Sequence, residues 1–509
     1  MDHFEHERAT KMMRKVAGSP LIWLLLFALH FNATRYRFEG VTIGQGDGLR
    51  YLYQAQSLCD GKGFVRYFRQ EGLPRDERGF PQSLPSKYVD RPETSLPPGY
   101  AVLLAGALLV SSGFPDATLA IVRAIQLAML LASCFFVYAA IWPRSKRLAI
   151  VGVIVFATFP PLHAAANHVL SETLSVFLCS GAALAISRLD ARGPSTWLCC
   201  LVGVLTVAIL LTAPGLTILS FLIWCYVAWR VRRSVSQILA LTIGSLVLMM
   251  PWQIHCYQAT GSVAWTVYEP LPVYGSEVAR WYRTWARSQD DLSILFGSEG
   301  AMALLPNEVF SSAEEREELT RLYDENLAGK AKSDYFERDF DPEWVDRGHD
   351  SRKLPYAPPA VEEAFKRAAD NRISQNPLRY YVILPLVRSV KLWGRGISYD
   401  GLAALARNGL LNWSILPILL TIAYWPYSAM RFRPRGFPLL VVLAVVSYTL
   451  LSSYTGCAEA RRNLPFYPLV LFTWFYLCDR KGVSGSRSPS ADGAMEEAGN
   501  VASGSDHGS

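Results

Sequence analysis

Long apolar stretches separated by short polar segments dominate the pattern of hydrophobic and polar positions in this chain. About 20 apolar residues cross a bilayer, and shorter stretches suffice where a helix is buried in protein. About ten stretches fit these lengths, at residues 17–31, 117–141, 148–164, 169–187, 196–211, 215–230, 235–251, 409–427, 437–453 and 465–479. The pattern predicts an all-α polytopic membrane protein with about ten transmembrane helices.

The basic residues fall on alternate connections between these stretches. The clusters begin at Arg8, Arg144, Arg188, Arg230, Arg431 and Arg480. All of them lie on one side if the N-terminus is cytoplasmic and the spans alternate, and cytoplasmic loops are where Lys and Arg are enriched. We therefore expect both termini in the cytoplasm of an integral, multi-pass membrane protein. The short loops favour a bacterial plasma membrane.

Two further apolar segments are too short to be counted as spans. Counting residues 98–111 would place the cluster at Arg144 outside and invert the clusters that follow, up to Arg233. We expect this segment to form a juxtamembrane or re-entrant helix on the outer face. Residues 380–393 contain Arg388 and Lys391 and are interpreted as an interfacial helix.

This threading divides the chain into four parts. Residues 1–251 form an N-terminal transmembrane module whose first outer loop covers 32–116. Residues 252–408 form an extracytoplasmic insert, and residues 409–480 form the C-terminal transmembrane helices. Residues 481–509 are rich in Ser, Gly and Ala and are expected to be a disordered cytoplasmic tail.

Helix signals occur inside the insert. A capping-box pattern, Ser311-Ser312-Ala313-Glu314, predicts a helix that begins there. A second helix is expected after Pro358-Pro359, continuing to Asn376-Pro377. The insert is therefore expected to be soluble in character and mainly helical.

The composition agrees with a membrane protein. Of 509 residues, 51% are hydrophobic and 18% are charged, whereas an ordinary soluble domain carries about 25% charged residues. The net charge of +7 comes from clusters between apolar stretches, so it does not indicate a nucleic-acid partner. The first apolar stretch lacks a small-residue cleavage site, and we interpret it as a retained helix.

The nine cysteines do not indicate a disulfide framework or a metal site. Five of them lie inside apolar stretches as small core residues, and no pair has metal-ligand spacing with histidines nearby. Cys59, Cys256 and Cys457 are expected on the outer side. A disulfide between two of these three stays open.

Ionisable residues are costly inside a bilayer and are candidates for function when they occur near spans. Here they gather at the expected outer face, as Asp47, Arg123, His168, Glu172, Arg461 and Arg462. Asp47 shares a helical face with Tyr51, Ala55 and Leu58 at spacings of four, four and three. Simpler interpretations are a solvated helix cap for Asp47 and a span flank for the arginines.

His168 and Glu172 are four residues apart and are expected to share one helical face. Arg91 lies in a polar segment close to Pro97-Pro98 and is a further candidate cation. Charges of both signs therefore converge on one membrane level, and an anionic ligand would explain the arginines there.

Six motifs in order along residues 32–478 resemble those of a known family. They are Asp47-Gly48-Leu49-Arg50-Tyr51 with Ala55, Leu58 and Gly61; Pro97-Pro98-Gly99-Tyr100; Arg123 with Gln126; Ser171-Glu172-Thr173-Leu174; Asn376-Pro377-Leu378-Arg379-Tyr380; and Ala460-Arg461-Arg462-Asn463-Leu464-Pro465. In these motifs the chain resembles the GT-C superfamily of integral-membrane glycosyltransferases, in particular its protein mannosyltransferase and aminoarabinose transferase-like branch.

The resemblance implies a GT-C-like fold and an inverting sugar transfer from a polyprenyl-phosphate donor to a hydroxyl on a lipid, glycan or protein acceptor. It implies that Asp47 is the catalytic base. Tyr51, Arg91, Arg123, His168, Glu172, Arg461 and Arg462 are the expected substrate-binding residues. No cofactor and no metal are expected.

The chain departs from the family pattern in two places. Leu96 stands where the family often has Lys or Arg before the proline motif, and Arg462 stands where an aromatic residue often follows the late arginine. The donor phosphate is then left to Arg91, Arg123 or Arg461.

Two other classes of function stay open. A transporter or flippase for lipid-linked sugars shares the apolar bundle but is expected to carry charges along a path through the membrane. A non-catalytic assembly partner would bind through the insert at 252–408.

Overall fold

A bundle of apolar helices forms the larger part of the computed structural model. The structure describes residues 47–67, 88–94, 96–111, 115–143, 146–157, 162, 165–261, 276–287, 299–328, 357–393, 441, 443–449, 466, 468 and 469. The bundle helices are α5 (Pro115–Ile141), α6 (Lys146–Ala157), α8 (Glu172–Arg192), α9 (Thr196–Leu210), α10 (Thr217–Val231) and α11 (Val235–Thr260). A short 3-10 turn, η1 (Pro214–Leu216), leads directly into α10.

Four helices of the described residues are long and apolar enough to cross a membrane. They are Asp116–Ile141, Glu172–Arg192, Pro214–Val231 and Val235–Thr260. The chain is therefore an integral membrane protein. Each coincides with a span expected from the sequence, while the total of about ten spans stays a prediction. The expected spans at 17–31 and 409–427 lie outside the described residues, and only parts of those at 437–453 and 465–479 are described.

The helices α9 and α11 run parallel and touch through glycines. Gln237 near the start of α11 donates to the Pro194 carbonyl before α9, and Trp252 and Cys256 pack with Val207 and Leu211 at the other ends. Gly203 and Gly244 lie at the crossing, where an added Cβ would come within 2.2 Å of the Leu241 carbonyl oxygen and 2.3 Å of the Cys200 carbonyl oxygen respectively. Small residues permit such close approach of helices in membranes.

The ends of α8 and α10 meet at the opposite end of the bundle from α3 and α4. There Tyr226 donates to the Asp190 carboxylate at 2.8 Å, and Arg230 pairs with the same oxygen at 3.5 Å. The directions of α8, α9, α10 and α11 thus alternate as the threading predicts. Which end faces the cytoplasm remains a prediction from the basic residues.

Several helix bounds differ from the expected spans. The helix α6 begins at Lys146, two residues before the expected span at 148–164, and its described part covers 12 residues. The helix α8 begins at Glu172, three residues later than expected, and continues to Arg192. The helix α11 continues to Thr260, across the boundary placed at residue 251.

The loop at 32–116, which the threading predicts to be the first outer loop, carries its own structure. It contains α3 (Asp47–Cys59), α4 (Pro98–Val110) and an antiparallel pair of strands, β1 (Val65–Tyr67) and β2 (Tyr88–Pro92). This small sheet was not predicted and adds to a predominantly helical fold, and the β-branched and aromatic residues of these short segments favour strands. At 13 residues, α4 is a short apolar helix, and its juxtamembrane position remains a prediction.

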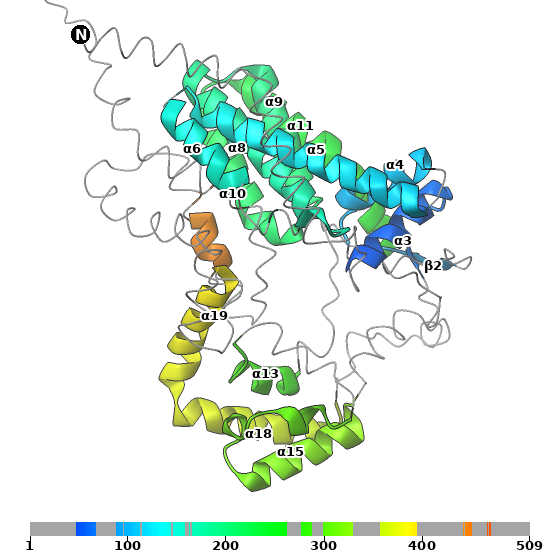
Figure 1. Ribbon diagram of the computed structural model, residues 1–509, viewed down its shortest axis with the longest axis vertical. Coiled ribbons are helices and arrows are strands. Elements are labelled where there is room, and N and C mark those ends of the chain that lie inside the picture. The colour runs from blue at the N-terminus through cyan, green and yellow to red at the C-terminus, as the bar shows by residue number, and fades with distance from the viewer. Residues whose placement is uncertain are drawn as a thin grey trace, which may run out of the picture.

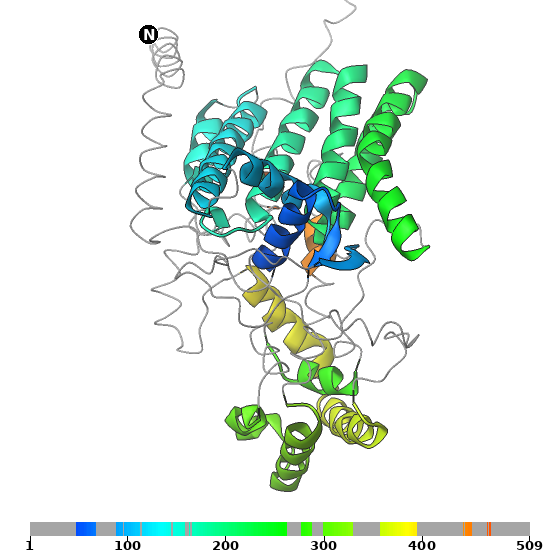
Figure 2. The same ribbon diagram turned by 90° about the vertical axis from the view of Figure 1, so that its right-hand side faces the viewer.

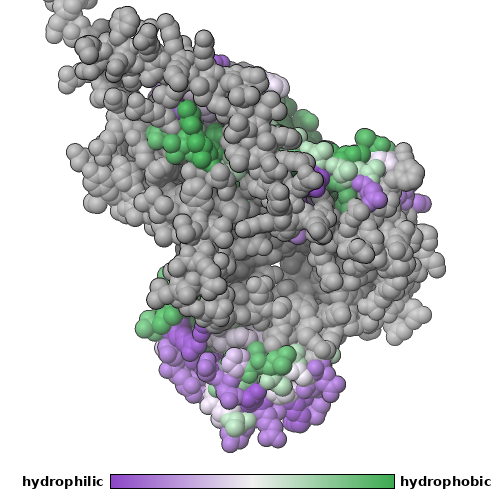
Figure 3. All heavy atoms as spheres, in the orientation of Figure 1, coloured by the Kyte–Doolittle hydropathy of each residue, from purple (hydrophilic) through white to green (hydrophobic). Residues whose placement is uncertain are grey.

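Figures 1 and 2 show α3 and α4 together at one end of the bundle, on the side that faces the insert. Tyr100, Leu104 and Leu108 of α4 form a core with Leu52 and Ala55 of α3. The hydropathy of the described surface differs between the two parts in Figure 3. Hydrophobic patches lie over the bundle, and polar residues dominate the insert.

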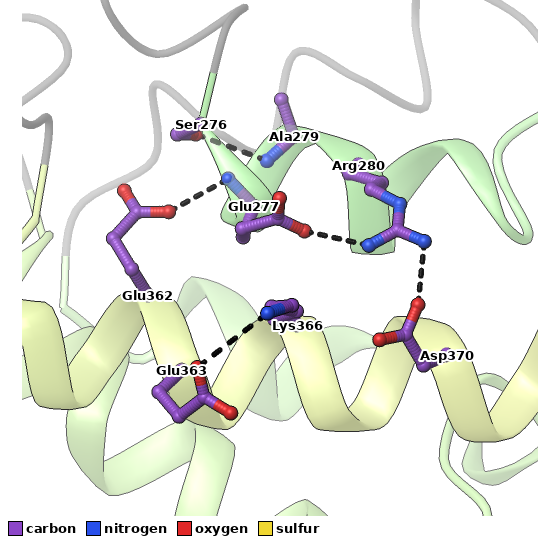
Figure 4. A network of polar contacts seen from close by, with 8 residues as sticks. All are labelled: Ser276, Glu277, Ala279, Arg280, Glu362, Glu363, Lys366 and Asp370. Carbon is purple, nitrogen blue, oxygen red and sulfur yellow. Dashed lines mark hydrogen bonds and ion pairs between the residues drawn. The ribbon is translucent and has the colours of Figure 1, made fainter.

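The insert has a separate hydrophobic core around the fully buried Trp281. Its helices are α13 (Glu277–Arg283), α15 (Ala313–Asn326) and α18 (Pro359–Gln375), with 3-10 turns η3 (Ala301–Leu304) and η4 (Asn307–Val309). Polar contacts tie α13 to α18 in Figure 4, where Arg280 bridges Glu277 and Asp370 and the Glu277 backbone N–H donates to Glu362. The two helices expected in the insert are confirmed.

The cap of α15 is displaced by one residue from the expected pattern. The Ser312 side chain accepts from the Glu315 backbone N–H, and the Glu315 carboxylate accepts from the Ser311 backbone N–H. The Ser312 hydroxyl also lowers the pKa of the Glu314 carboxyl. Ser312 is therefore the N-cap, and the Glu315 carboxylate binds the backbone N–H of Ser311, the residue before the N-cap.

The segment that follows α18 turns from a π-helix, η7 (Arg379–Ile383), into α19 (Leu384–Trp393). Arg388 is buried and donates to the backbone carbonyls of Ala286 and Arg283 near α13. The sequence predicts an interfacial helix for this segment. The Arg388 guanidinium finds its hydrogen-bond acceptors on backbone carbonyls of the insert.

Candidate functional site

Asp47 is the first residue of α3. An acidic residue is favourable there because the helix dipole is positive at this end. The expected shared face exists, since Tyr51 and Ala55 are buried and Leu58 packs against the same core. Asp47 lies one helical turn before Tyr51 along this face, while its side chain is outside the described part of the structure.

Tyr51 joins α3 to two other segments. Its ring meets the Tyr100 ring edge-on, with centroids 5.2 Å apart. Its hydroxyl donates to the Ser171 hydroxyl at 3.4 Å, directly before α8. The first two motifs of the sequence therefore contact each other, and the first also contacts the fourth.

Tyr100 is fully buried at the start of α4. Its hydroxyl accepts a hydrogen bond of 2.9 Å from the Gln126 amide of α5. Burial raises the pKa of Tyr100 well above its ordinary value, and the carboxylate of Glu172 raises it further. Tyr100 thus stays a neutral phenol close to an acidic group.

Glu172 is the first residue of α8 and is buried. The sequence placed it one turn into a helix with His168 on the same face, and this was wrong. His168 precedes the helix, in a segment where its backbone carbonyl accepts from Gln126 at 3.0 Å. A carboxylate at the helix start is stabilised by the dipole instead.

Arg123 lies in α5, one turn before Gln126 on the same face. It is half-buried, and its Nε is buried with no hydrogen-bond partner among the described residues. A buried guanidinium N–H without an acceptor costs free energy. An anionic group brought by a substrate would supply that acceptor.

A second cluster lies at the same end and was not found from the sequence. Glu93 follows β2, is buried, and pairs with Arg50 of α3 at 3.5 Å. The Glu93 carboxylate also accepts from the Leu96 backbone N–H, and its carbonyl lies 3.0 Å from His255 Nε2 of α11. Glu93 therefore connects three elements, which are α3, the segment that precedes α4, and α11.

The remaining site residues are less defined. Arg91 lies in β2, with its side chain outside the described part, and Arg461 and Arg462 lie outside the described residues altogether. Cys59 and Cys256 are free thiols. In the described ranges, no group of three His, Cys, Asp or Glu residues is placed to hold a metal ion.

The described site belongs to an integral membrane protein in which α3 and α4, with their small sheet, pack onto one end of a helical bundle. No model of a protein family matches the chain, and no curated protein matches it. Among solved structures, it is similar to ArnT from Cupriavidus metallidurans in the apo state, at 12% identity and a TM-score of 0.36, over 90% of this chain and 78% of that chain.

A second structure, ArnT from Cupriavidus metallidurans bound to undecaprenyl phosphate, is similar at 13% identity and the same TM-score of 0.36, with the same coverage of 90% and 78%. At this TM-score, neither the fold nor the activity of this chain is inferred from the likeness.

Proposed function

We propose that the protein is an inverting glycosyltransferase that moves a sugar from a polyprenyl-phosphate donor to a hydroxyl acceptor at the extracytoplasmic face of the membrane. One observation carries the proposal. Four sequence segments that resemble GT-C motifs meet at one end of the apolar bundle, through the contacts among Tyr51, Tyr100, Gln126 and Ser171. These segments are far apart in sequence.

Asp47 is the proposed catalytic base. Its carboxylate accepts the proton of the acceptor hydroxyl as that oxygen forms a bond to the anomeric carbon. The bond between the anomeric carbon and the phosphate oxygen breaks, and polyprenyl phosphate leaves with the electron pair. Attack from the face opposite the leaving group inverts the anomeric carbon.

The leaving phosphate gains negative charge and needs a cation close by. We assign Arg123 to contact the phosphate, because its Nε is buried without an acceptor in the described residues. Arg91, Arg461 and Arg462 are further candidates from the sequence. The prenyl tail would lie along the apolar helices, which explains why such a site belongs at the membrane.

The sugar and the acceptor are assigned to the other polar groups. Glu172 is the first residue of α8, His168 lies in the segment before it, and Tyr51 contacts Ser171 of that segment. We assign Glu172 to orienting the sugar or the acceptor hydroxyl. The acceptor is a lipid, glycan or protein hydroxyl, and the insert at 252–408 helps to shape its binding.

The test is transfer from a radiolabelled polyprenyl-phosphate sugar by purified protein in lipid nanodiscs. Asp47→Asn removes the base with little change in shape and is expected to lower transfer by at least about 100-fold, since general base catalysis contributes about 10²–10⁴-fold. Asp60→Asn is the matched control, because Asp60 is exposed just after the same helix. Arg461→Ala is expected to weaken use of the donor.

Full transfer by well-folded Asp47→Asn protein would contradict the proposal. Movement of labelled lipid across the bilayer without covalent transfer would instead identify a lipid-linked sugar transporter. A loss that follows deletion of the insert but not Asp47→Asn would identify an assembly partner.

A further inference from the structure

Gln126 is a fully buried amide inside α5, a helix long and apolar enough to span the membrane. A polar group in such a place is costly unless it is hydrogen-bonded. The proposed chemistry assigns Gln126 no contact with a substrate. Its contacts therefore call for another explanation.

The Gln126 Nε2 group donates to two different segments. One bond of 2.9 Å goes to the Tyr100 hydroxyl at the start of α4. The other, of 3.0 Å, goes to the His168 carbonyl in the segment before α8. An amide nitrogen has two hydrogens, so both donors are used.

From Tyr100 the connection continues to α3. The Tyr100 ring lies edge-on against Tyr51 at 5.2 Å between centroids, and both rings are buried. Tyr51 in turn donates to Ser171, next to Glu172. A closed circuit of contacts thus joins α5, α4, α3 and the start of α8, and Gln126 holds two of its members.

A simpler explanation is that Gln126 is a buried side chain whose two amide N–H groups happen to find acceptors, while its Oε1 has no partner among the described residues. Ser133 shows how α5 satisfies such a group locally, since its buried hydroxyl donates to the Met129 carbonyl of its own helix at 2.7 Å. Gln126 instead bonds across 26 and 42 residues of sequence. These long-range bonds constrain other segments, whereas the bond of Ser133 does not.

We propose that Gln126 is a positioning residue that fixes the helix carrying Asp47 relative to the start of α8, which carries Glu172. This inference rests on the proposed glycosyl transfer for its effect on rate. Its structural part, the restraint on α3, can be measured without any activity. Geometry held to within about 1 Å is worth up to about 100-fold in rate.

Three variants separate the contributions. Gln126→Leu keeps a similar volume and removes both donors. Tyr100→Phe removes one oxygen, the acceptor of one of the two bonds. Ser133→Ala is the matched control, because it removes a buried polar group from the same helix without touching the circuit. Each variant is purified in nanodiscs and compared with the wild type by the folded fraction, the kcat and KM for donor, and hydrogen exchange of the α3 amides.

In Gln126→Leu we expect kcat per folded molecule to fall about 10- to 100-fold with a donor KM within about threefold of the wild type. We also expect faster exchange of the α3 amides, with the amides of α11 unchanged. Tyr100→Phe should shift both readouts in the same direction and less far. Ser133→Ala should change neither.

Unchanged exchange in α3 for Gln126→Leu overturns the proposal, and so does an activity loss that follows only from a smaller folded fraction. If Gln126→Leu does not fold, Tyr100→Phe decides by the same two criteria. A wild-type protein without any transfer activity would contradict the proposed function but not the proposed role of Gln126 in restraining α3. The exchange measurement would then still support or refute the restraint on α3.

Discussion

The backbone N–H of Gly99 donates to the carbonyl of Leu211 at 2.9 Å. This bond fastens the first turn of α4 to the end of α9, and it places the two backbones in direct contact. A Cβ at Gly99 would lie 2.8 Å from the Leu211 carbonyl oxygen and 2.6 Å from the Thr212 hydroxyl. The glycine of the Pro97-Pro98-Gly99-Tyr100 motif is thus required by lack of space.

Gly99→Ala is expected to push α4 away from α9. Overpacking of this kind costs about 1–3 kcal/mol, and the shift also moves Tyr100 in the next position. We expect a lower temperature of thermal unfolding and lower transfer activity. Gly106→Ala in the same helix is the control, since nothing lies within 4 Å of its added Cβ. Equal unfolding temperatures for the two variants would contradict the close contact at Gly99.

Gly203→Ala and Gly244→Ala are expected to separate α9 from α11. Their added Cβ atoms would meet backbone carbonyls at 2.2 and 2.3 Å, and a backbone atom cannot turn aside as a side chain can. Each should lower the free energy of unfolding by at least about 1–3 kcal/mol. Gly181→Ala is the control, with its nearest atoms at 3.7 Å. Equilibrium unfolding by urea in detergent, monitored by tryptophan fluorescence, measures the free energy of unfolding of each variant.

The bundle could be predicted from the sequence because apolar stretches of membrane length leave few alternatives. The stretches at 117–141 and 215–230 form helices at nearly the expected positions, and the one at 235–251 begins as expected and continues to Thr260. The same reasoning failed at His168. A four-residue spacing means a shared face only inside a helix, and His168 precedes α8, with its backbone carbonyl bonded to Gln126.

The cluster of Glu93 with Arg50 and His255 shows the other limit of sequence reasoning. Glu93 and His255 are 162 residues apart, and neither stands in a local pattern that marks it. Their contact depends on how β2 and the end of α11 come together. Periodicity reports which face of one helix is buried, but it does not report which distant segment covers that face.

Cys59 is expected to react slowly with alkylating reagents. Burial, and then the charge of Asp60, raise the pKa of the Cys59 thiol, and only the thiolate reacts. At a given pH near 8 the thiolate fraction is therefore smaller than for a free cysteine, and the rate should keep rising at higher pH. Asp60→Asn removes the second cause and should speed the reaction. Peptide mass spectrometry over pH 7–10 measures both, and a rate equal to that of a free thiol would refute the shift.

Arg123 offers the sharpest test of where the donor phosphate binds. If its buried Nε–H finds its acceptor on the phosphate, Arg123→Leu loses a charge-assisted hydrogen bond worth about 1.5–3 kcal/mol, which is about 10- to 100-fold in the donor KM. Arg123→Lys keeps the charge without the planar fork and should recover part of the loss. Arg232→Leu is the control, since Arg232 is exposed just after α10, at the opposite end of the bundle. Titration with unlabelled polyprenyl phosphate as competitor separates binding from turnover. An unchanged competitor affinity in Arg123→Leu would remove Arg123 from the phosphate site and leave Arg91 and Arg461 as the candidates.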